Sequence, residues 1–445
     1  MNRESRRLGP EATVNLIGGT RRLRTSIVAL VFAALYLGSV AGASATGSAA
    51  QFSAVTVGYN HSCALTAAGL AYCWGDNEYG QLGDNSAGED SAYPVEVIMP
   101  DGVSQFSSIS AGFDATCALT GDGVAYCWGY NEYGQLGIGT NDDAAEPQPV
   151  DGDLLFSMIE AGPWVTCGVT KAGDGYCWGF NDYGQLGNDD HDDTESGLAD
   201  ANSPQLVHGG IKFKSISVGD NTTCGVSRRG VGYCWGTGNN GELGNGDYSV
   251  EDGGNGFDAD SAVPVPVAGA LKFNTIRTAS EHSCGLTTKG AVYCWGDGTY
   301  GQLGIGSIPD GPDGNPFMAE PTLTLAPRAK KLFGSGYGWS TCIIDKSDHA
   351  SCWGWNAGFD YDYDDEHQHT NGSILGTGSH AYQEESPASV IGGFRFVEID
   401  SDYYHACGLT NSGLVYCWGW GYDGQFGTGY AESTYGPVLP VAWGE

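Results

Sequence analysis

The chain has 445 residues, with 53 acidic and 19 basic side chains and a formal net charge of −34 at pH 7. This excess of negative charge disfavours nucleic acid and anionic membranes as partners, because binding to either relies on basic patches. The 72 glycines and the scarcity of helix-period apolar runs favour an all-β, turn-rich fold.

The first 45 residues have the pattern of an export signal. Arginines within residues 21–24 precede the apolar run of residues 27–40, and small residues at 43–45 supply a cleavage site. The run is short for a membrane span, so we expect a cleaved signal peptide over residues 1–45, with an uncleaved anchor as the alternative. A short linker, residues 46–50, follows, and no membrane insertion is expected after cleavage.

A repeat occupies the rest of the chain, from residue 51 to residue 443. The tetrapeptide Tyr-Cys-Trp-Gly of residues 72–75 returns, with drift, in seven copies that are 50 to 65 residues apart. Repeats of about 50 residues that contain short strands are typical of propeller blades. The sequence therefore predicts one all-β domain over residues 51–443, a seven-bladed β-propeller with four-stranded blades.

Each repeat carries two cysteines ten positions apart, and six residues after the first cysteine stands a glycine or, in the sixth repeat, Asp348. Both residue types tolerate a left-handed turn, so the pattern predicts an antiparallel hairpin in which Cys63 faces Cys73. Directly opposed residues lie about 4.5–5.5 Å apart, which suits a disulfide. Spacing alone does not fix connectivity, but we expect seven bridges within repeats and an oxidising compartment. The expected pairs are Cys63 with Cys73, Cys117 with Cys127, Cys167 with Cys177, Cys224 with Cys234, Cys284 with Cys294, Cys342 with Cys352, and Cys407 with Cys417.

The residues around each second cysteine indicate how blades pack. Tyr72 and Trp74 lie on the face of their strand opposite Cys73, because side chains alternate along a strand. We expect each blade to offer its disulfide to one neighbour and its tryptophan to the other. The Gly-Gln-Leu-Gly segment at residues 80–83 lacks the lysine and the helix of a phosphate loop, so we interpret it as a structural turn.

Proline-containing strands suggest how the ring closes. In the second blade we expect strands at residues 94–98, 106–110, 117–120 and 124–129. The first repeat has no such proline strand, whereas a spare one, residues 437–441, ends the chain. We therefore expect the C-terminal strand to pair with the N-terminal blade and to remove the exposed sheet edges.

Two motifs of the first repeat point to a family. The hairpin G-x-x-H-x-C-A-L-T at residues 58–66, followed by W-G-x-N-x-Y-G-Q-L-G at residues 74–83, resembles the regulator of chromosome condensation repeat. The resemblance covers about residues 51–443 and implies a seven-bladed β-propeller that acts by binding other proteins. The paired cysteines depart from the nuclear members of the family and indicate a secreted, disulfide-containing branch.

The loops that join the first two strands of each blade differ between repeats, although the surrounding motif is constant. Strand alternation places these loops and the long acidic inserts on one face. Variation within a constant scaffold favours recognition over tolerated drift, and aromatic residues dominate binding hot spots. The predicted partner-binding residues are Tyr59, His61, Phe113, Asp114, Trp164, Asp220, His282, Tyr337, Trp339, Tyr403 and Tyr404.

Two acidic inserts are rich in oxygen donors that suit Ca²⁺. Neither matches an EF-hand loop, so a solvated acidic loop is the alternative interpretation. The candidate metal ligands are Asp189, Asp190, Asp192, Asp193, Asp362, Asp364, Asp365 and Glu366.

The leading hypothesis is a secreted, monomeric propeller without a cofactor that binds an unidentified protein through one face. One alternative is an acidic, calcium-stabilised structural or surface component without a single partner. Another is a hydrolase or a sugar-binding propeller, which would need a deep pocket with convergent polar groups. No nucleophile–base–acid motif occurs in the sequence, so we expect no enzyme activity.

Overall fold

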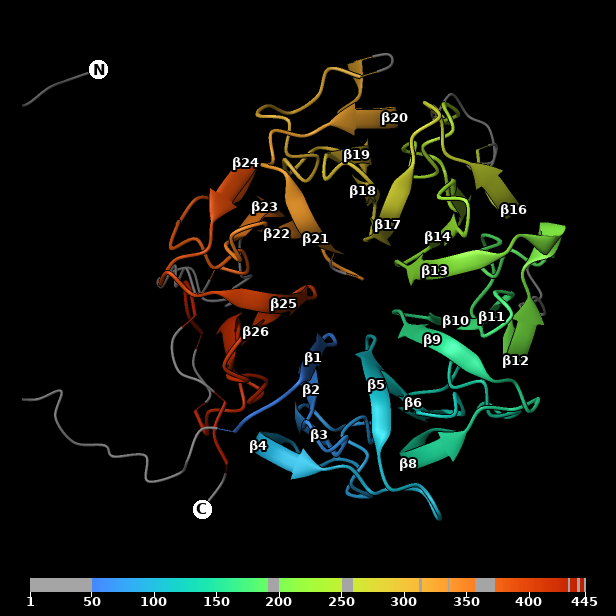
Figure 1. Cartoon of the computed structure of the whole chain (residues 1–445), viewed down its shortest axis with the longest axis vertical. Helices are drawn as coiled ribbons and strands as arrows, with labels where there is room; N and C mark the ends of the chain where they lie inside the picture. Colours follow the sequence, from blue (N-terminus) through green and yellow to red (C-terminus); the bar gives the residue numbers. More distant parts are fainter. Residues whose placement is uncertain are drawn as a thin grey trace, which may run out of the picture. The chain divides into compact units, whose positions relative to one another are not determined.

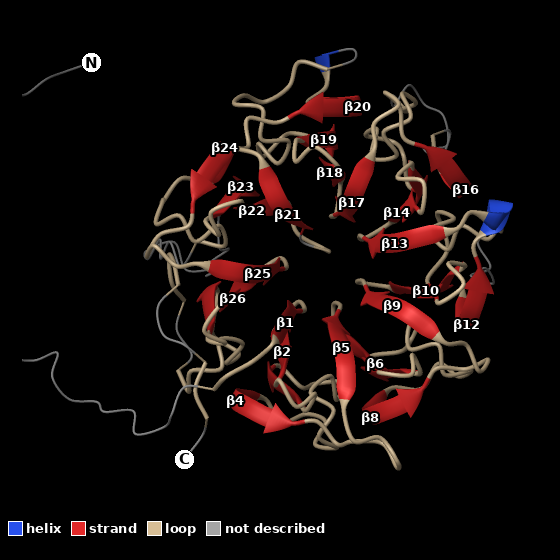
Figure 2. Cartoon of the chain, viewed as in Figure 1, coloured by secondary structure: helices blue, strands red, loops and turns tan. Residues whose placement is uncertain are grey.

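The computed structural model describes residues 50–190, 200–249, 259–311, 314–334, 336–356, 373–430, 433–437 and 441–443. Residues 47–445 form one compact unit. Its described residues form a ring of seven antiparallel sheets, which confirms the predicted all-β, seven-bladed propeller (Figure 2). The predicted signal peptide lies outside the described residues. Within the part of the chain that is described, no helix has the length and apolar character needed to cross a membrane.

The first strand of each blade points toward the centre of the ring (Figure 1). The first strands are β1 (Ala54–Val57), β5 (Phe106–Ala111), β9 (Phe156–Ala161), β13 (Phe213–Val218), β17 (Phe273–Thr278), β21 (Ala329–Gly334) and β25 (Phe396–Ser401). Each pairs with a second strand: β2 (His61–Leu65), β6 (Ala115–Thr120), β10 (Val165–Thr170), β14 (Thr222–Ser227), β18 (His282–Thr287), β22 (Ser340–Asp345) or β26 (His405–Thr410).

The third strands carry the second cysteine and the repeat tryptophan. They are β3 (Ala71–Gly75), β7 (Ala125–Gly129), β11 (Gly175–Gly179), β15 (Gly232–Gly236), β19 (Val292–Asp297), β23 (Ala350–Trp355) and β27 (Val415–Gly419). The fourth strands lie at the rim of the ring (Figure 1). They are β4 (Ser91–Glu96), β8 (Ala144–Pro149), β12 (Ala201–Leu206), β16 (Ser261–Pro266), β20 (Phe317–Leu323) and β24 (Gln383–Ser389), and a short 3₁₀ turn, η1 (His208–Gly210), follows β12.

The hairpin between the second and third strands has the predicted register. Cys63 lies opposite Cys73, and the three-residue turn closes where the Gly69 N–H donates to the Thr66 carbonyl at 2.9 Å. Gly69 has a φ of 77°, a left-handed conformation that a side chain would strain. The same register recurs in the other six hairpins, where each first cysteine lies directly opposite its second.

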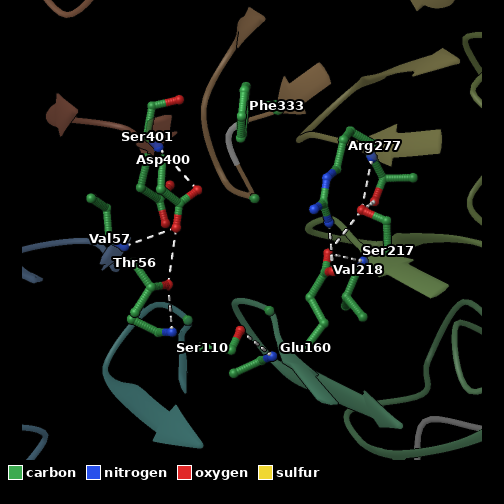
Figure 3. A pocket seen from close by; sticks show the side chains of 18 of the residues that line it. Thr56, Val57, Ser110, Glu160, Ser217, Val218, Arg277, Phe333, Asp400 and Ser401 are labelled. Carbon is green, nitrogen blue, oxygen red and sulfur yellow. Dashed lines mark hydrogen bonds and ion pairs between the residues drawn. The ribbon is translucent and has the colours of Figure 1, made fainter. Parts of the chain in front are cut away.

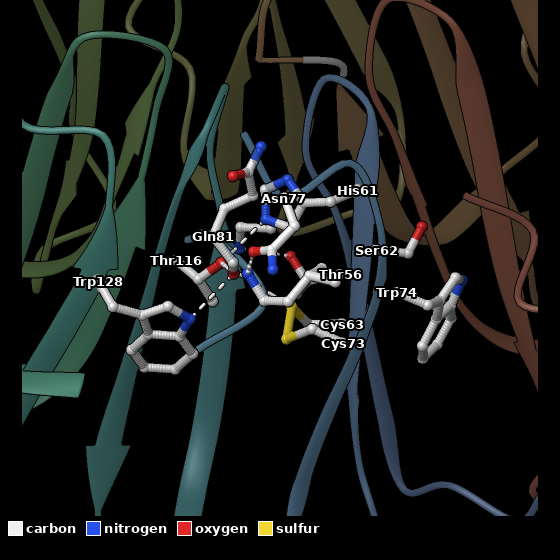
Figure 4. The surroundings of a disulfide bond; sticks show 12 residues. Thr56, His61, Ser62, Cys63, Cys73, Trp74, Asn77, Gln81, Thr116 and Trp128 are labelled. Atoms are coloured by element: carbon white, nitrogen blue, oxygen red, sulfur yellow. Dashed lines mark hydrogen bonds between the residues drawn. A yellow bond between two sulfur atoms is a disulfide. The ribbon is translucent and has the colours of Figure 1, made fainter. Parts of the chain in front are cut away.

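All seven expected disulfides are present, which confirms the predicted pairing within repeats. All fourteen cysteines are buried, and the Cys63–Cys73 bridge lies beside Thr116 of the next blade (Figure 4). The bridges join Cys63 to Cys73, Cys117 to Cys127, Cys167 to Cys177, Cys224 to Cys234, Cys284 to Cys294, Cys342 to Cys352, and Cys407 to Cys417.

The repeat tryptophans join neighbouring blades. The indole N–H of Trp128 donates to the Gln81 carbonyl of the preceding blade at 2.9 Å, and the Thr116 hydroxyl donates to the same oxygen at 3.1 Å (Figure 4). All seven repeat tryptophans are buried and make the equivalent bond, at 2.8 to 3.0 Å. The Gly-Gln-Leu-Gly segment is therefore a structural turn, as predicted, and its glutamine carbonyl accepts hydrogen bonds from the next blade.

The predicted assignment of the proline strands to blades was wrong. Pro94 lies in β4, the fourth strand of the first blade, where Val95 pairs with Cys73 of β3. The first blade is thus complete without the C-terminus. The chain that follows β3 reverses direction at the Gly-Gln-Leu-Gly turn, and the nearest unpaired sheet edge is that of β3 itself. The next strand therefore pairs with β3 in the same blade.

The C-terminal segment accordingly belongs to the last blade and does not complete the first. The Val441 N–H donates to the Val415 carbonyl of β27 at 2.9 Å, the position of a fourth strand. The described part of this segment also touches the N-terminal blade: the Ala50 N–H donates to the Val441 carbonyl at 3.2 Å, and Trp443 packs on Phe52 and Tyr72. The ring closes where β1 lies against β25 and β26.

Antiparallel order gives every blade two ends. The tip end carries the loops between first and second strands, here called tip loops, and the loops between third and fourth strands. The opposite end, here called the hairpin face, carries the hairpin turns and the segments that enter the next first strand. Each hairpin turn contacts the segment that enters the next first strand; for example, the Phe106 N–H donates to the Gly69 carbonyl at 2.8 Å.

Candidate binding face

The tip loops converge around the axis of the ring. The rings of Phe113, from the second blade, and Tyr337, from the sixth, meet edge to face with centroids 5.2 Å apart. These blades are not neighbours, so their contact spans the ring and covers its centre at the tip end.

Seven aromatic residues predicted as partner contacts form one connected cluster at this end. Tyr59 stacks on Phe113 with ring centroids 4.0 Å apart, and Phe113 stacks on Trp164 at 5.0 Å. The Tyr59 hydroxyl donates to the Tyr404 hydroxyl at 3.1 Å. Each member is partly exposed. We call this cluster the aromatic cap; its members are Tyr59, Phe113, Trp164, Tyr337, Trp339, Tyr403 and Tyr404.

Glycines before the cap residues explain how the tip loops come so close. A Cβ atom on Gly58 would lie 2.2 Å from the Gly112 carbonyl oxygen, and a Cβ on Gly112 would lie 2.2 Å from that of Gly162. Such distances are impossible for real atoms, so only glycine permits the approach. The backbone therefore holds Tyr59 and Phe113 over the centre of the ring.

A second set of aromatic residues surrounds the cap and was missed by sequence reasoning. Tyr133 lies 5.6 Å from Trp164, Trp355 lies 5.2 Å from Tyr403, and Tyr300 extends the contact beyond Trp339 at 5.4 Å between centroids. Tyr133 and Tyr300 occupy the repeated tyrosine position of the W-G-x-N-x-Y segment, and their repetition hid their place beside the cap. Trp355 stands at the variable third position of that segment and is buried beneath the cap residue Tyr403.

The two histidines among the predicted partner-binding residues are inside the protein, and their prediction as surface contacts was wrong. His61 and His282 are 0% and 2% exposed. His61 Nε2 lies 2.9 Å from Thr116 Oγ1 in the next blade, and His282 Nε2 lies 2.8 Å from Thr341 Oγ1. Burial disfavours the imidazolium and lowers the pKa of both residues to about 3. These neutral side chains join neighbouring blades.

Carboxyl groups with raised pKa values border the cap. Asp220 accepts a hydrogen bond from the Trp164 indole N–H at 2.9 Å, and its burial raises the pKa to about 6. Burial and the nearby Asp90 raise the pKa of Asp76 to about 6. Asp114 is 9% exposed, and burial and Asp76 raise its pKa to about 7. Ionisation of these three carboxyl groups is unfavourable in the free protein, and a positive charge on a partner would favour it.

A polar cavity of about 220 Å³ lies below the cap and is lined by the first strands of all seven blades (Figure 3). Arg277 Nη1 contacts Glu160 Oε2 at 2.6 Å, and Asp400 accepts hydrogen bonds from the Thr56 hydroxyl and the Val57 N–H, each at 2.9 Å. The cavity lining includes no histidine, cysteine or lysine among the described residues.

The predicted calcium ligands are largely outside the described residues. Only Asp189 and Asp190 are described, and Asp189 lies 3.7 Å from His208. No group of three or more potential ligand residues is found within the described ranges. Asp192, Asp193, Asp362, Asp364, Asp365 and Glu366 lie outside them, so calcium binding stays a prediction.

Comparison with protein families gives matches in every blade except the sixth. Two family models described as regulator of chromosome condensation (RCC1) repeat match the chain. One matches residues 52–81, 106–135, 280–302 and 397–425, and the other matches residues 68–119, 122–169 and 172–226.

Similar curated proteins and solved structures agree with this result. The ultraviolet-B receptor UVR8 of Arabidopsis thaliana is 28% identical over 86% of this chain and 68% of its own length. The E3 ubiquitin-protein ligase HERC2 of Homo sapiens is 30% identical over 81% of this chain, which spans only 6% of that ligase. The structure of human WBSCR16 superposes with a TM-score of 0.69 at 18% identity, over 84% of this chain and 94% of its own, and shows the shared fold.

Proposed function

This chain belongs to the regulator of chromosome condensation repeat family, and on that premise we propose that it binds a partner protein through its aromatic cap. Relatives in this family include a receptor and a GTPase regulator, and Prp20p of Saccharomyces cerevisiae, which has the same fold, binds Gsp1p and histones. The names of the GTPase regulator and of Prp20p point to protein ligands, which supports a protein-binding role for this chain.

The observation that carries the proposal is the connected aromatic cap. Its rings come from the first, second, third, sixth and seventh blades and are fixed by mutual stacking and by the glycines beneath them. Large aromatic side chains that are already ordered lose little entropy on binding and supply most of the energy in typical hot spots. A partner can therefore dock on this face without first ordering it.

The surroundings of the cap favour a partner with lysine or arginine side chains. Asp76, Asp220 and Glu281 are partly exposed, and burial together with neighbouring charge raises the pKa of Asp76 and Glu281. A cation placed among these carboxyl groups would gain charge pairing, and it would also stack on the faces of tyrosine and tryptophan rings. We infer a partner surface with an apolar centre and basic margins.

The compartment is part of the proposal. Seven buried disulfides favour an oxidising environment, such as the periplasm or the extracellular space. We propose that the protein is exported, acts there as a monomer, and has no enzyme activity of its own.

Affinity capture from the native extracellular fluid tests the proposal, using the protein with and without EDTA. A single captured protein should be lost with Trp164→Ala or Tyr337→Ala, each of which should weaken binding at least tenfold. Tyr430→Ala is the matched control, because Tyr430 is 51% exposed and lies outside the cap. Equal capture by the cap variants and the control would refute the proposal. No selective capture, together with a large drop in melting temperature on addition of EDTA, would favour the calcium-stabilised structural alternative.

A further inference from the structure

The positive charges of the propeller are gathered at the end opposite the aromatic cap. Of the chain's 19 lysines and arginines, six lie within residues 1–45 and Arg277 lies in the central cavity. The other twelve are all exposed and all lie on the hairpin face. Five occupy hairpin turns: Lys171, Arg228, Arg229, Lys289 and Lys346. Seven lie where the chain enters a first strand: Lys212, Lys214, Lys272, Arg328, Lys330, Lys331 and Arg395.

Hydrogen bonds between blades join these residues into one arc, here called the basic arc. Arg228 Nη2 donates to the Lys171 carbonyl at 3.0 Å, which links the third and fourth blades. Lys214 Nζ donates to the Phe273 carbonyl at 3.0 Å, which links the fourth and fifth. Arg328 Nη1 donates to the Lys289 carbonyl, which links the fifth and sixth. The arc therefore follows more than half of the ring without a break.

Few negative charges oppose the basic arc. The turns and entry segments that carry these cations contain two carboxylates, and both are paired: Asp174 with Lys212 and Asp348 with Lys330. Three more, Asp122, Asp151 and Asp153, lie where the arc begins, next to Lys171 and Leu155. By contrast, the turns and entry segments of the first two blades carry no lysine or arginine. The overall net charge of −34 thus conceals a strongly positive sector on one face.

We propose that the hairpin face docks on a lipid bilayer that carries anionic phospholipids, with the aromatic cap turned away from the bilayer. The ring repeats the same hairpin at the same level in each blade, so the cations of the arc lie in one plane. A plane of separate cations matches a plane of phosphate headgroups better than it matches one compact acidic ligand. Leu155 is 46% exposed and its carbonyl accepts from the Lys171 N–H at 3.1 Å, so it adds an apolar contact next to the arc.

The negative charge of the rest of the molecule does not prevent this docking. Six-residue strands separate the hairpin turns from the tip loops by about 20 Å. The Debye length is only about 10 Å at 0.1 M salt, so the distant carboxylates are screened while the nearby cations still act. The docking face is separate from the proposed protein-binding face, and the two can be tested independently.

Sedimentation of the full chain with vesicles tests the proposal. We expect binding to vesicles of phosphatidylcholine with about 40% phosphatidylglycerol, as a test composition, at about 0.1 M NaCl, and loss of binding at about 1 M NaCl. Each surface cation contributes roughly fivefold to partitioning. The variant Lys171→Gln/Arg228→Gln/Lys289→Gln/Arg328→Gln should therefore bind at least tenfold more weakly. The variant Glu78→Gln/Glu89→Gln, with exposed charges removed at the tip end, should bind no more weakly than the parent.

Hydrogen exchange in the presence of vesicles identifies the face that makes contact. Protection should be confined to hairpin turns 171–174, 228–231 and 288–291, and this readout is unaffected by binding through residues 1–45. Unchanged binding by the folded quadruple variant, or protection of the tip loops instead, would overturn the proposal. Binding to heparin without any binding to the vesicles would also overturn the proposal, because it would identify a soluble polyanion as the ligand of the basic arc.

Discussion

A single glycine tests how tightly neighbouring blades are joined. Gly304 ends the Gly-Gln-Leu-Gly turn of the fifth blade with a φ of 62°, and a Cβ atom there would lie 2.6 Å from Nε1 of the buried Trp353. That nitrogen donates to the Gln302 carbonyl at 2.9 Å. Gly304→Ala must therefore adopt a left-handed backbone and also displace the tryptophan that joins the fifth and sixth blades.

The expected magnitude follows from three contributions. The left-handed conformation costs about 1–2 kcal/mol in any non-glycine residue. Overpacking against the indole costs about 1–3 kcal/mol, and a lost hydrogen bond that leaves a buried donor costs a further ~1–2 kcal/mol. We expect Gly304→Ala to lower the free energy of unfolding by about 3–7 kcal/mol.

Gly210 provides the matched control. It has the same φ of 62°, but a Cβ atom there would meet nothing within 4 Å. Gly210→Ala should thus cost only the backbone contribution, about 1–2 kcal/mol. The assay is a urea titration under oxidising conditions, followed by tryptophan fluorescence and circular dichroism. Equal losses for the two variants would refute the proposed role of the tryptophan contact.

Three further predictions concern pH, disulfides and the cavity. Burial raises the pKa of Glu242 to about 8, so this group contributes stability below its unfolded pKa that is lost as the pH rises through 8. Stability should therefore increase when the pH is lowered from 8 to 6.5. Glutamine is the residue found at this position in most repeats, and Glu242→Gln should flatten the rise and stabilise the protein at pH 8 by about 1–2 kcal/mol. Urea titrations at each pH would measure both effects. Below pH 6.5 the buried neutral His282 opposes this increase in stability. Its pKa is lowered in the folded state, so the stability that the neutral imidazole contributes is lost as the pH falls toward 3. The double variant Cys63→Ser with Cys73→Ser should lower the free energy of unfolding by about 2–3 kcal/mol, and an unchanged urea midpoint would contradict the stabilising role of that bridge. Arg277→Met should cost about 3–5 kcal/mol because Glu160 is left without its cation, whereas the double variant with Glu160→Gln should recover most of that loss in the same titration.

The aromatic cap shows where sequence reasoning about function reached its limit. The tip positions were identified because they vary within a constant repeat, and all seven aromatic members do lie together. Their contacts could not be derived, since Phe113 and Tyr337 meet only when a ring of seven blades has closed. The same reasoning placed His61 on the surface, because period-two alternation gives the side of a strand but not whether a neighbouring blade covers it.

The charge distribution could not be derived from the sequence for a related reason. Net charge was taken to disfavour anionic membranes, but it sums over faces that lie about 20 Å apart, and the position of each lysine relative to the ring was unknown. Once the hairpin turns are placed at one end of the blades, Lys171 and Arg228 become neighbours although 57 residues separate them. Only the assembled ring shows that the positive charges share a face.

The sequence by itself determined the repeat, the blade number and the hairpin register, because each depends on contacts between residues close in the chain. It made the seven disulfides within repeats the expected pairing, since a three-residue turn places Cys63 opposite Cys73, and the structure confirmed that pairing. The phase of the blades was decided only by the tertiary structure. A cyclic repeat reads the same from any starting point, so the sequence could not tell whether Pro94 begins one blade or ends another. That choice depends on which sheet edge is open when the next strand arrives. The ring closure, the burial of the two histidines and the grouping of residues on each face likewise depend on contacts between blades, which the sequence does not show.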